Sequence, residues 1–306
     1  MLSILKKKLL SLSRQHQGIL ALVLLAWVFA TMGLFARQLD TNFALFEQTY
    51  LRIALALVLG IIIFWPKLRW VVIKSISLKD SGVLFARSVF LYLAVVLITE
   101  AILNTKFSTA TIITVLPLMP ILGYIFLREV VRVKTLLWIV VGFIGSVLVA
   151  IQSFNSFSFG YGELMALCSI LLFDISYITR KWQSKELNNY ESTVIMFGFA
   201  VPFLFITSLV LGEALPDASD FTLSMLAFLL IAALFNVVNL LLTNFGFEHV
   251  KAAVAGNILT LEVFFVLLYG FFFYGEVPVL REVIGGLLIL ISVFAVNYLE
   301  NKKPVA

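Results

Sequence analysis

Apolar stretches of about twenty residues follow one another along the chain and are separated by short polar clusters. An α-helix needs about 20 apolar residues to cross a bilayer core about 30 Å thick. Strands of a membrane barrel would instead show alternating segments of about ten residues. The pattern therefore predicts spanning helices, and ten stretches qualify: 18–36, 46–66, 82–103, 107–127, 135–152, 160–179, 192–212, 222–244, 252–274 and 283–299.

Composition supports a membrane protein and narrows its chemistry. The chain is 62% apolar and 13% charged, whereas soluble domains are about 45–50% apolar and about 25% charged. Ten helices would use roughly 200 of the 306 residues, which leaves no room for a soluble enzyme domain. A single cysteine, Cys168, excludes a disulfide framework, and two histidines, His16 and His249, argue against a zinc site. We expect no metal and no cofactor.

The first apolar stretch follows three lysines and must be distinguished from a cleavable signal peptide. Its charge-free run from Gly18 to Ala36 has nineteen residues, longer than the apolar core of about 7–15 residues in a signal peptide. We therefore count it as a transmembrane helix.

The distribution of Lys and Arg predicts the orientation. With a cytoplasmic N-terminus, 17 of the 22 basic residues fall on the cytoplasmic side, three fall outside, and Arg52 and Arg87 lie within helices. The positive-inside rule then places both termini in the cytoplasm. A plasma (inner) membrane is the expected location. The net charge of +5 is accordingly assigned to the membrane surface, with membrane lipid as a partner, and not to nucleic acid.

The two halves of the chain share a motif. An apolar helix closes with Glu129-Val130 in the first half and with Glu276-Val277 in the second, 147 residues apart. Each half holds five helices, an odd number, so the second half would be inverted relative to the first. Inverted repeats are typical of secondary transporters with a site near the membrane midplane. We predict an all-α integral membrane protein of ten transmembrane helices in two inverted five-helix repeats, 18–152 and 160–299, with tails 1–17 and 300–306.

These residues resemble the drug/metabolite transporter superfamily, in particular its ten-helix EamA-type permeases. The resemblance rests on the Pro-containing fourth helix ending in Glu129, on Arg52, on Phe173–Tyr177 running into Arg180-Lys181, and on Leu261-Glu262 before Gly275-Glu276. Two positions depart from the family pattern: Val263 stands where proline is usual, and Asp174 where a small apolar residue is usual. The resemblance implies secondary transport, frequently efflux, of small polar metabolites or amphipathic compounds.

Ionisable residues inside predicted helices are the first candidates for the site, because charge at membrane depth is costly. Arg52 can grip a carboxylate or phosphate, or be held by an internal partner. Asp174 and Glu262 can bind a substrate amine, carry a coupling proton, or serve only structure. Arg87, near the inner end of its helix, is expected to reach the cytoplasmic interface.

Polar and aromatic residues in mid-helix complete the candidate site. Asn236 and Asn239 either join helices or line the cavity, and Asn257 has the same alternatives. Trp27 lies too deep for an interfacial belt, which makes it a candidate for substrate binding. Pro117 and Pro120 would break the fourth helix and suit gating. Small residues Gly142, Gly145 and Ser146 predict close helix packing, within a monomer or in a homodimer.

Three functions compete. The first is a secondary transporter, an exporter by its resemblance to the family, whose substrate is an amino acid or related zwitterion. A proton is the candidate coupling ion, and alternating access is the mechanism. The second is a broad exporter of amphipathic cations or drugs, favoured if both carboxylates face the cavity and Arg52 does not. The third is an intramembrane enzyme, which would need a nucleophile–base pair or metal cluster at membrane depth.

Overall fold

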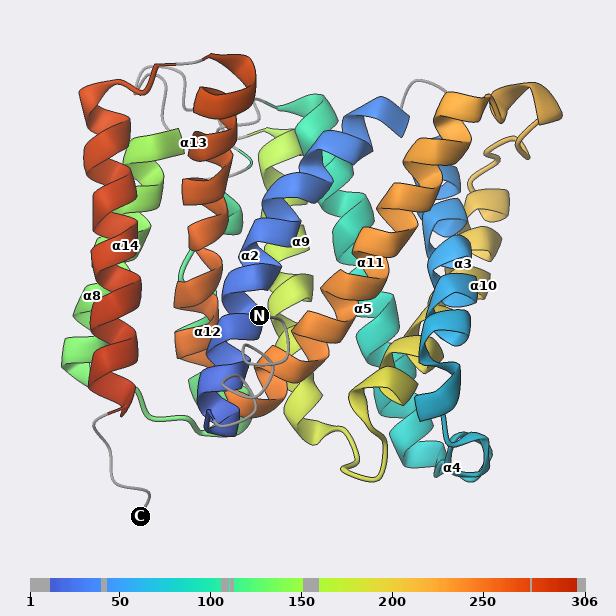
Figure 1. Cartoon of the computed structure of the whole chain (residues 1–306), viewed down its shortest axis with the longest axis horizontal. Helices are drawn as coiled ribbons and strands as arrows, with labels where there is room; N and C mark the ends of the chain where they lie inside the picture. Colours follow the sequence, from blue (N-terminus) through green and yellow to red (C-terminus); the bar gives the residue numbers. More distant parts are fainter. Residues whose placement is uncertain are drawn as a thin grey trace, which may run out of the picture.

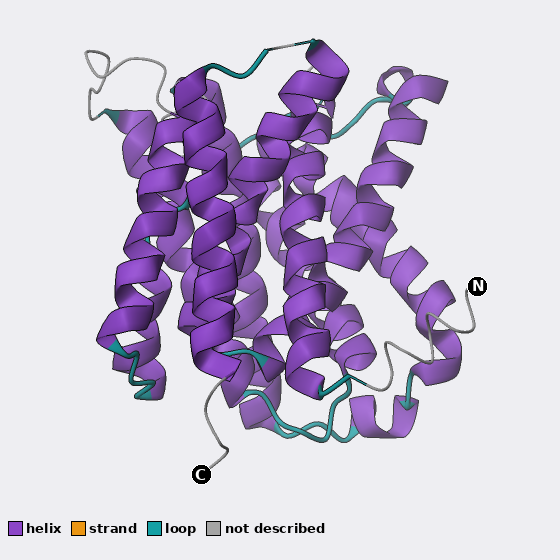
Figure 2. Cartoon of the chain, turned by 60° about the vertical axis from the view of Figure 1, so that its left-hand side comes forward, coloured by secondary structure: helices purple, strands orange, loops and turns teal. Residues whose placement is uncertain are grey.

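The computed structural model describes residues 12–39, 43–105, 110, 113–150, 160–275 and 277–301. Within these residues the secondary structure is helical, as Figures 1 and 2 show. Nine helices are long and apolar enough to span a membrane, counting only the part of the chain that is described. The α-helices are α2 (Arg14–Leu39), α3 (Leu45–Phe64), α4 (Trp70–Lys74), α5 (Leu78–Asn104), α7 (Leu118–Leu127), α8 (Val133–Ala150), α9 (Tyr161–Ile178), α10 (Asn189–Val210), α11 (Leu223–His249), α12 (Ala252–Leu259), α13 (Leu261–Tyr274) and α14 (Leu280–Asn301).

The nine long spans coincide with nine of the ten predicted stretches. The remaining stretch, 107–127, is described only in part, and its described helix α7 has ten residues. The predicted all-helical membrane fold is therefore confirmed. The count of ten helices, the repeat boundaries and the motif partner Glu276, which lies outside the described residues, stay predictions.

Two of the helices in the bundle are interrupted. The stretch before α7 leaves helical geometry over residues 115–117, and Pro117 forms the N-cap of α7. Proline has no N–H for the helical ladder, so an interruption at this point follows from the sequence. The predicted stretch 252–274 also divides, at Thr260, into α12 and α13 without any proline. In the proposed repeats these two interrupted helices are equivalent, and α12 packs against α7.

Helices pack in pairs that each take one member from each predicted half. The largest contacts join α8 to α14 and α5 to α9, followed by α2 with α11 and α3 with α10. In Figure 1 the pair α8 and α14 forms one end of the bundle, and α3 and α10 form the other. Inverted repeats that interlock would give this pairing, because every helix then meets a helix from the opposite half.

Small residues fix the α8–α14 pair at short distance. A Cβ added to Gly145 would lie 2.7 Å from the carbonyl oxygen of Gly285, and one added to Gly285 would lie 2.6 Å from that of Gly145. A Cβ on Gly142 would lie 2.6 Å from Ser292 Oγ. The predicted small-residue face is therefore used within the chain, where the backbones touch through positions that lack a side chain.

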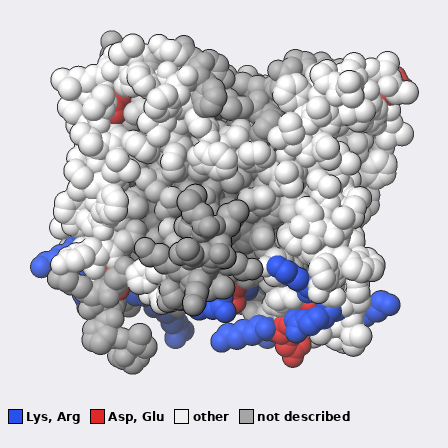
Figure 3. All heavy atoms as spheres, viewed as in Figure 1, with Lys and Arg blue, Asp and Glu red and all other residues white. Residues whose placement is uncertain are grey.

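Basic side chains gather along one end of the helices. Figure 3 shows Lys and Arg at the lower edge of the visible face, where α3 ends and α5 begins. An uneven distribution of this kind is the charge asymmetry on which the predicted orientation rests.

Candidate functional site

A cavity of about 230 Å³ lies inside the bundle and is lined by both interrupted helices. The segment before and within α7 contributes Thr114 to Pro120, including Pro117 and Pro120, and α12–α13 contribute Gly256 to Glu262. The lining extends toward the end opposite the basic residues, as far as Ile102 on α5 and Met32 on α2. It stops at Tyr177 on α9 in the other direction. The cavity is therefore displaced toward the sparsely charged end.

Arg52 enters the cavity from α3. Its side chain is buried, with 4% exposure. Nε donates to the carbonyl oxygen of Gln48 over 3.1 Å, and Nη2 donates to Thr49 Oγ1 over 3.4 Å. Both partners belong to its own helix, and no carboxylate among the described residues forms an ion pair with it. The guanidinium thus faces the cavity with its charge uncompensated in the described part of the chain.

The two carboxyl groups predicted from sequence line the same cavity. Asp174 is 2% exposed, and its Oδ2 is buried without a hydrogen-bond partner among the described residues. Glu262 lies in the first turn of α13, beside the interruption at Thr260. Neither carboxyl forms an ion pair within the described ranges, so Arg52 does not neutralise them directly.

Three asparagines line the cavity, and their hydrogen-bond partners differ. Asn236 donates to the carbonyl oxygen of Ala232 on its own helix over 2.8 Å. Asn239 donates to Met32 Sδ on α2 over 3.3 Å. Asn257 accepts from Ser292 Oγ over 2.9 Å, while its Nδ2 is buried without a partner in the described structure. Asn239 and Asn257 therefore join helices and also present polar atoms to the cavity.

Two lining features were not expected from sequence. Tyr92 on α5 is 2% exposed and lines the cavity. Tyr177 stacks on Phe247 of α11 with ring centroids 4.7 Å apart and forms the inner limit of the lining. A tyrosine in mid-helix was the available signal, but tyrosine is common in membrane helices and does not by itself mark a site.

Trp27 does not line this cavity, so its role in substrate binding stays a prediction. Its side chain is 41% exposed and contacts Phe235, with ring centroids 6.1 Å apart. The cavity side of α2 is centred near Phe29, two residues on, which is about 200° around the helix. The position of a residue along a helix does not give the direction of its side chain.

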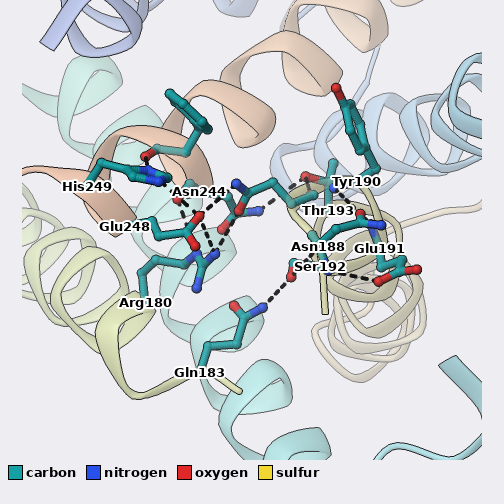
Figure 4. Close-up of polar contacts among 12 residues, drawn as sticks. Arg180, Gln183, Asn188, Tyr190, Glu191, Ser192, Thr193, Asn244, Glu248 and His249 are labelled. Atoms are coloured by element: carbon teal, nitrogen blue, oxygen red, sulfur yellow. Dashed lines mark hydrogen bonds and ion pairs between the residues drawn. The ribbon is translucent and has the colours of Figure 1, made fainter. Parts of the chain in front are cut away.

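Polar contacts close the bundle at its basic end, as Figure 4 shows. Arg180, at the end of α9, pairs with Glu248 over 2.9 Å and donates to Asn189 Oδ1 over 2.7 Å. Gln183 donates to Ser192, and Asn244 donates to Thr193 over 3.1 Å. These contacts join α9, α10 and α11.

Arg87 is part of this closure. It is 1% exposed and donates to the Ser176 carbonyl oxygen over 3.2 Å, to Gln183, and to Asn244 Oδ1 over 2.9 Å. The expectation that Arg87 reaches the cytoplasmic interface is wrong. Three neutral acceptors hold its side chain inside the bundle, from α9, from the segment after α9 and from α11. Hydrogen bonds to neutral acceptors satisfy its donors without a carboxylate.

A peripheral ion pair supports the same end. Arg69, in the segment between α3 and α5, donates to Glu191 at the start of α10 over 2.8 Å from both Nε and Nη2. The hydrogen bond to Glu191 raises the pKa of Arg69 above its ordinary value. The pair therefore stays charged and ties the ends of two helices together.

Glu129 makes two polar contacts near the basic end of the bundle. Its Oε2 accepts from the backbone N–H of Ala252, the first residue of α12, over 2.9 Å. Its Oε1 accepts from Lys181 at the end of α9. One carboxylate therefore joins the segment after α7 to α9 and α12. The Glu of the shared Glu-Val motif thus has a physical role in the first half: Glu129 accepts from the first N–H of α12, a helix of the second half.

Comparisons with known proteins bear on the second half and on the fold. Residues 160–298 match the EamA-like transporter family. Of 29 matching chains of solved structures, one, described only as a crystal structure of a protein, aligns with a TM-score of 0.74 over 94% of this chain and 100% of its own. It is 15% identical in sequence, so the likeness extends to the fold alone. No curated protein matches the chain.

Proposed function

We propose that the chain, whose residues 160–298 match the EamA-like transporter family, is a secondary transporter of a small zwitterion. An amino acid or a related metabolite is the proposed substrate, and the cavity between the two interrupted helices is the proposed site. Membrane transport itself follows from the family; the substrate class and the mechanism are inferred from the cavity.

The observation that carries the proposal is the charge in the cavity. Arg52 supplies a cation, Asp174 and Glu262 supply two carboxyl groups, and all three line one space without pairing to one another. A buried charge without a protein partner is costly unless a ligand compensates it. A zwitterion brings a carboxylate for Arg52 and an ammonium for Asp174 or Glu262.

The alternative of a broad exporter of amphipathic cations fits this cavity less well. That function was expected only if Arg52 faced away, whereas Arg52 lines the cavity together with both carboxyls. The volume of about 230 Å³ is also below the range of about 300–1,000 Å³ typical of pockets for drug-sized ligands. Both features favour a small substrate that carries charges of both signs.

Alternating access is the proposed mechanism, and the chain is proposed to export. The cavity extends toward one end of the bundle, and the separate contacts of Glu129, Arg87 and Arg180 are proposed to close it at the other end. Discontinuous helices that meet at a central site are the elements that secondary transporters use to reverse access. Pro117 and Pro120 are proposed to permit the movement of α7.

The basic, closed end is proposed to face the cytoplasm, with both termini on that side of a plasma (inner) membrane. A cysteine in place of Ser219, in the loop before α11, should then react with an impermeant maleimide only from outside, with Cys168 removed. A cysteine in place of Ser184 should react only from inside. Labelling of both from one side would exclude this orientation.

Asp174 or Glu262, whose carboxyl groups line the cavity, is proposed to bind the coupling proton. Asp174→Asn or Glu262→Gln, whichever removes the carrier, is expected to abolish proton-driven transport in proteoliposomes. Exchange of substrate for substrate should persist, because exchange needs no net proton movement. If both single variants retain full proton-driven transport, neither residue is the carrier.

The function is tested by binding of three matched ligands to the purified chain: leucine, its decarboxylated amine and its deaminated acid. Leucine should bind at least about tenfold more tightly than either partner, since each partner lacks one charge-assisted hydrogen bond, a contribution of about 1.5–3 kcal/mol. Equal or tighter binding of the amine would favour the cation exporter. No binding of any amino acid would reject the proposed substrate class.

A further inference from the structure

We propose that Asn257 donates a hydrogen bond to the side chain of the substrate. A zwitterion whose side chain carries an acceptor, such as an amide carbonyl, is then preferred over an apolar one of the same shape. Asn257 is the specificity-determining residue in this inference, which rests on the proposed function and adds the side-chain class to it.

Asn257 has hydrogen-bonding capacity that the described protein does not use. Its side chain lines the cavity from α12 and is 2% exposed. A primary amide offers one carbonyl oxygen and two N–H donors. Oδ1 accepts from Ser292 Oγ on α14 over 2.9 Å, whereas Nδ2 is buried without a partner in the described part of the chain. An unpaired buried donor is costly, and a ligand that accepts from it removes that cost.

Contacts with α8 and α14 set the direction of the amide. Ser292 Oγ also donates to the carbonyl oxygen of Trp138 on α8 over 2.6 Å, so its one proton is shared between two acceptors. A Cβ added to Gly142 on α8 would lie 3.1 Å from Asn257 Oδ1. The carbonyl arm of the amide is thus turned toward the α8–α14 pair. The N–H arm diverges from it and is left for a ligand in the cavity.

The polar groups beside Asn257 have other roles. Thr260 lines the cavity, and its Oγ1 donates to the backbone carbonyl oxygen of Asn257 over 2.7 Å. Glu262, on the other side of the division at Thr260, carries a carboxyl group proposed to bind the substrate ammonium. The interrupted helix therefore offers the ligand both a carboxyl group and an N–H donor. An apolar substrate side chain would leave this donor unpaired.

Arg52 and Asn257 approach the cavity from opposite sides. Arg52 comes from α3, whereas the amide of Asn257 contacts α14. Figure 1 places α3 and α14 toward opposite ends of the bundle, with α2 and α11 between them. A ligand whose carboxylate meets Arg52 therefore extends its other groups toward Asn257.

The first experiment measures dissociation constants of leucine and asparagine for the purified full chain. The two side chains have nearly the same shape, but asparagine carries an amide where leucine carries two methyl groups. Asparagine should bind at least about tenfold more tightly, because its carbonyl oxygen accepts from Asn257. Without a partner for the amide the order would reverse, since burial favours methyl groups and penalises polar ones. Equal or tighter binding of leucine would overturn the inference.

The second experiment assigns the preference to Asn257. Asn257→Leu keeps the shape of the side chain and removes the donor. Asparagine binding should weaken by at least about tenfold, and leucine binding should change by less than about threefold. Asn257→Asp keeps the acceptor for Ser292 but not the donor, and should show the same loss for asparagine if Asn257→Leu does not fold.

Asn297→Leu is the matched control. Asn297 on α14 donates to the carbonyl oxygen of Val293 on its own helix over 2.8 Å and does not line the cavity. Its substitution makes the same chemical change outside the proposed site. Both dissociation constants should therefore stay unchanged.

The outcomes separate the two proposals. An unchanged ratio of asparagine to leucine affinity in Asn257→Leu would overturn the role of Asn257, and so would equal losses for both ligands. The zwitterion site would still stand in either case if leucine binds more tightly than its decarboxylated amine. Failure of every amino acid to bind would reject the proposed function and this inference together.

Discussion

Arg52→Gln is expected to fold and to lose about 10- to 100-fold in affinity for leucine, while its affinity for the decarboxylated amine stays within about threefold. The guanidinium donates hydrogen bonds to Gln48 and Thr49 on its own helix and forms no ion pair in the described part of the chain, so removing it leaves no carboxylate there unpaired. The amine lacks the carboxylate that Arg52 is proposed to bind, so the substitution should leave the affinity for the amine nearly unchanged. Equilibrium binding of both ligands to the purified variant measures the effect.

Arg87→Gln is the matched control for this variant. Both arginines are buried, but Arg87 donates to Ser176, Gln183 and Asn244, which would each lose a charged donor. Arg87→Gln should therefore lower the melting temperature and leave the ratio of leucine to amine affinity unchanged. A well-folded Arg52→Gln protein with unchanged leucine affinity would contradict the zwitterion site. Equal losses for leucine and amine would indicate that Arg52 shapes the cavity without binding the carboxylate.

Membrane helices were predictable because the bilayer imposes length and apolarity on them directly. The division at Thr260 was not, because no proline or glycine stands at that residue. Its neighbour Val263 donates to the Thr260 carbonyl oxygen over 3.1 Å, and Thr260 Oγ1 donates to that of Asn257 over 2.7 Å. Two local hydrogen bonds made by Thr260, one through its side chain, therefore accompany a break that no proline or glycine signals.

The site was predictable to the extent that charge and depth determine it. Arg52, Asp174 and Glu262 were found because ionisable groups at membrane depth are expensive and are kept for a reason. Trp27 and Arg87 show the limit of this reasoning. Sequence gives the relative angle between residues on one helix but not the direction in which a face points, which depends on packing between helices. Trp27 consequently lies outside, and Arg87 turns inward.

Two groups of contacts at the basic end, those of Arg87 and those of Glu129, differ in how easily they can separate during transport. Three buried contacts of Arg87 join α5, α9 and α11 within the protein interior, and opening there would break hydrogen bonds without replacement. Glu129 is different. Its ion pair with Lys181 is partly exposed, with 14% and 24% of the two side chains accessible, so water can replace the partners when they separate. Movement of α7 relative to α12 is therefore easiest at Glu129.

Glu129→Ala is expected to open the cavity toward the basic end, which is proposed to face the cytoplasm. The variant removes both the ion pair with Lys181 and the acceptor for the Ala252 N–H, and loss of about 1.5–3 kcal/mol raises the open population about 10- to 100-fold. A cysteine in place of Met119, which lines the cavity, reports this opening once Cys168 is removed. An impermeant maleimide applied from the cytoplasmic side of oriented vesicles should label it at least about tenfold faster in Glu129→Ala than in the parent.

Glu300→Ala provides the control, because Glu300 near the end of α14 forms a different ion pair, with Lys251 over 2.8 Å. It should leave the labelling rate unchanged. Glu129→Gln should label at an intermediate rate, since the amide oxygen still accepts from Ala252 while the ion pair is lost. Equal labelling in Glu129→Ala and the parent would show that the cavity is closed elsewhere, and the Arg87 contacts would then be the barrier that must break during transport.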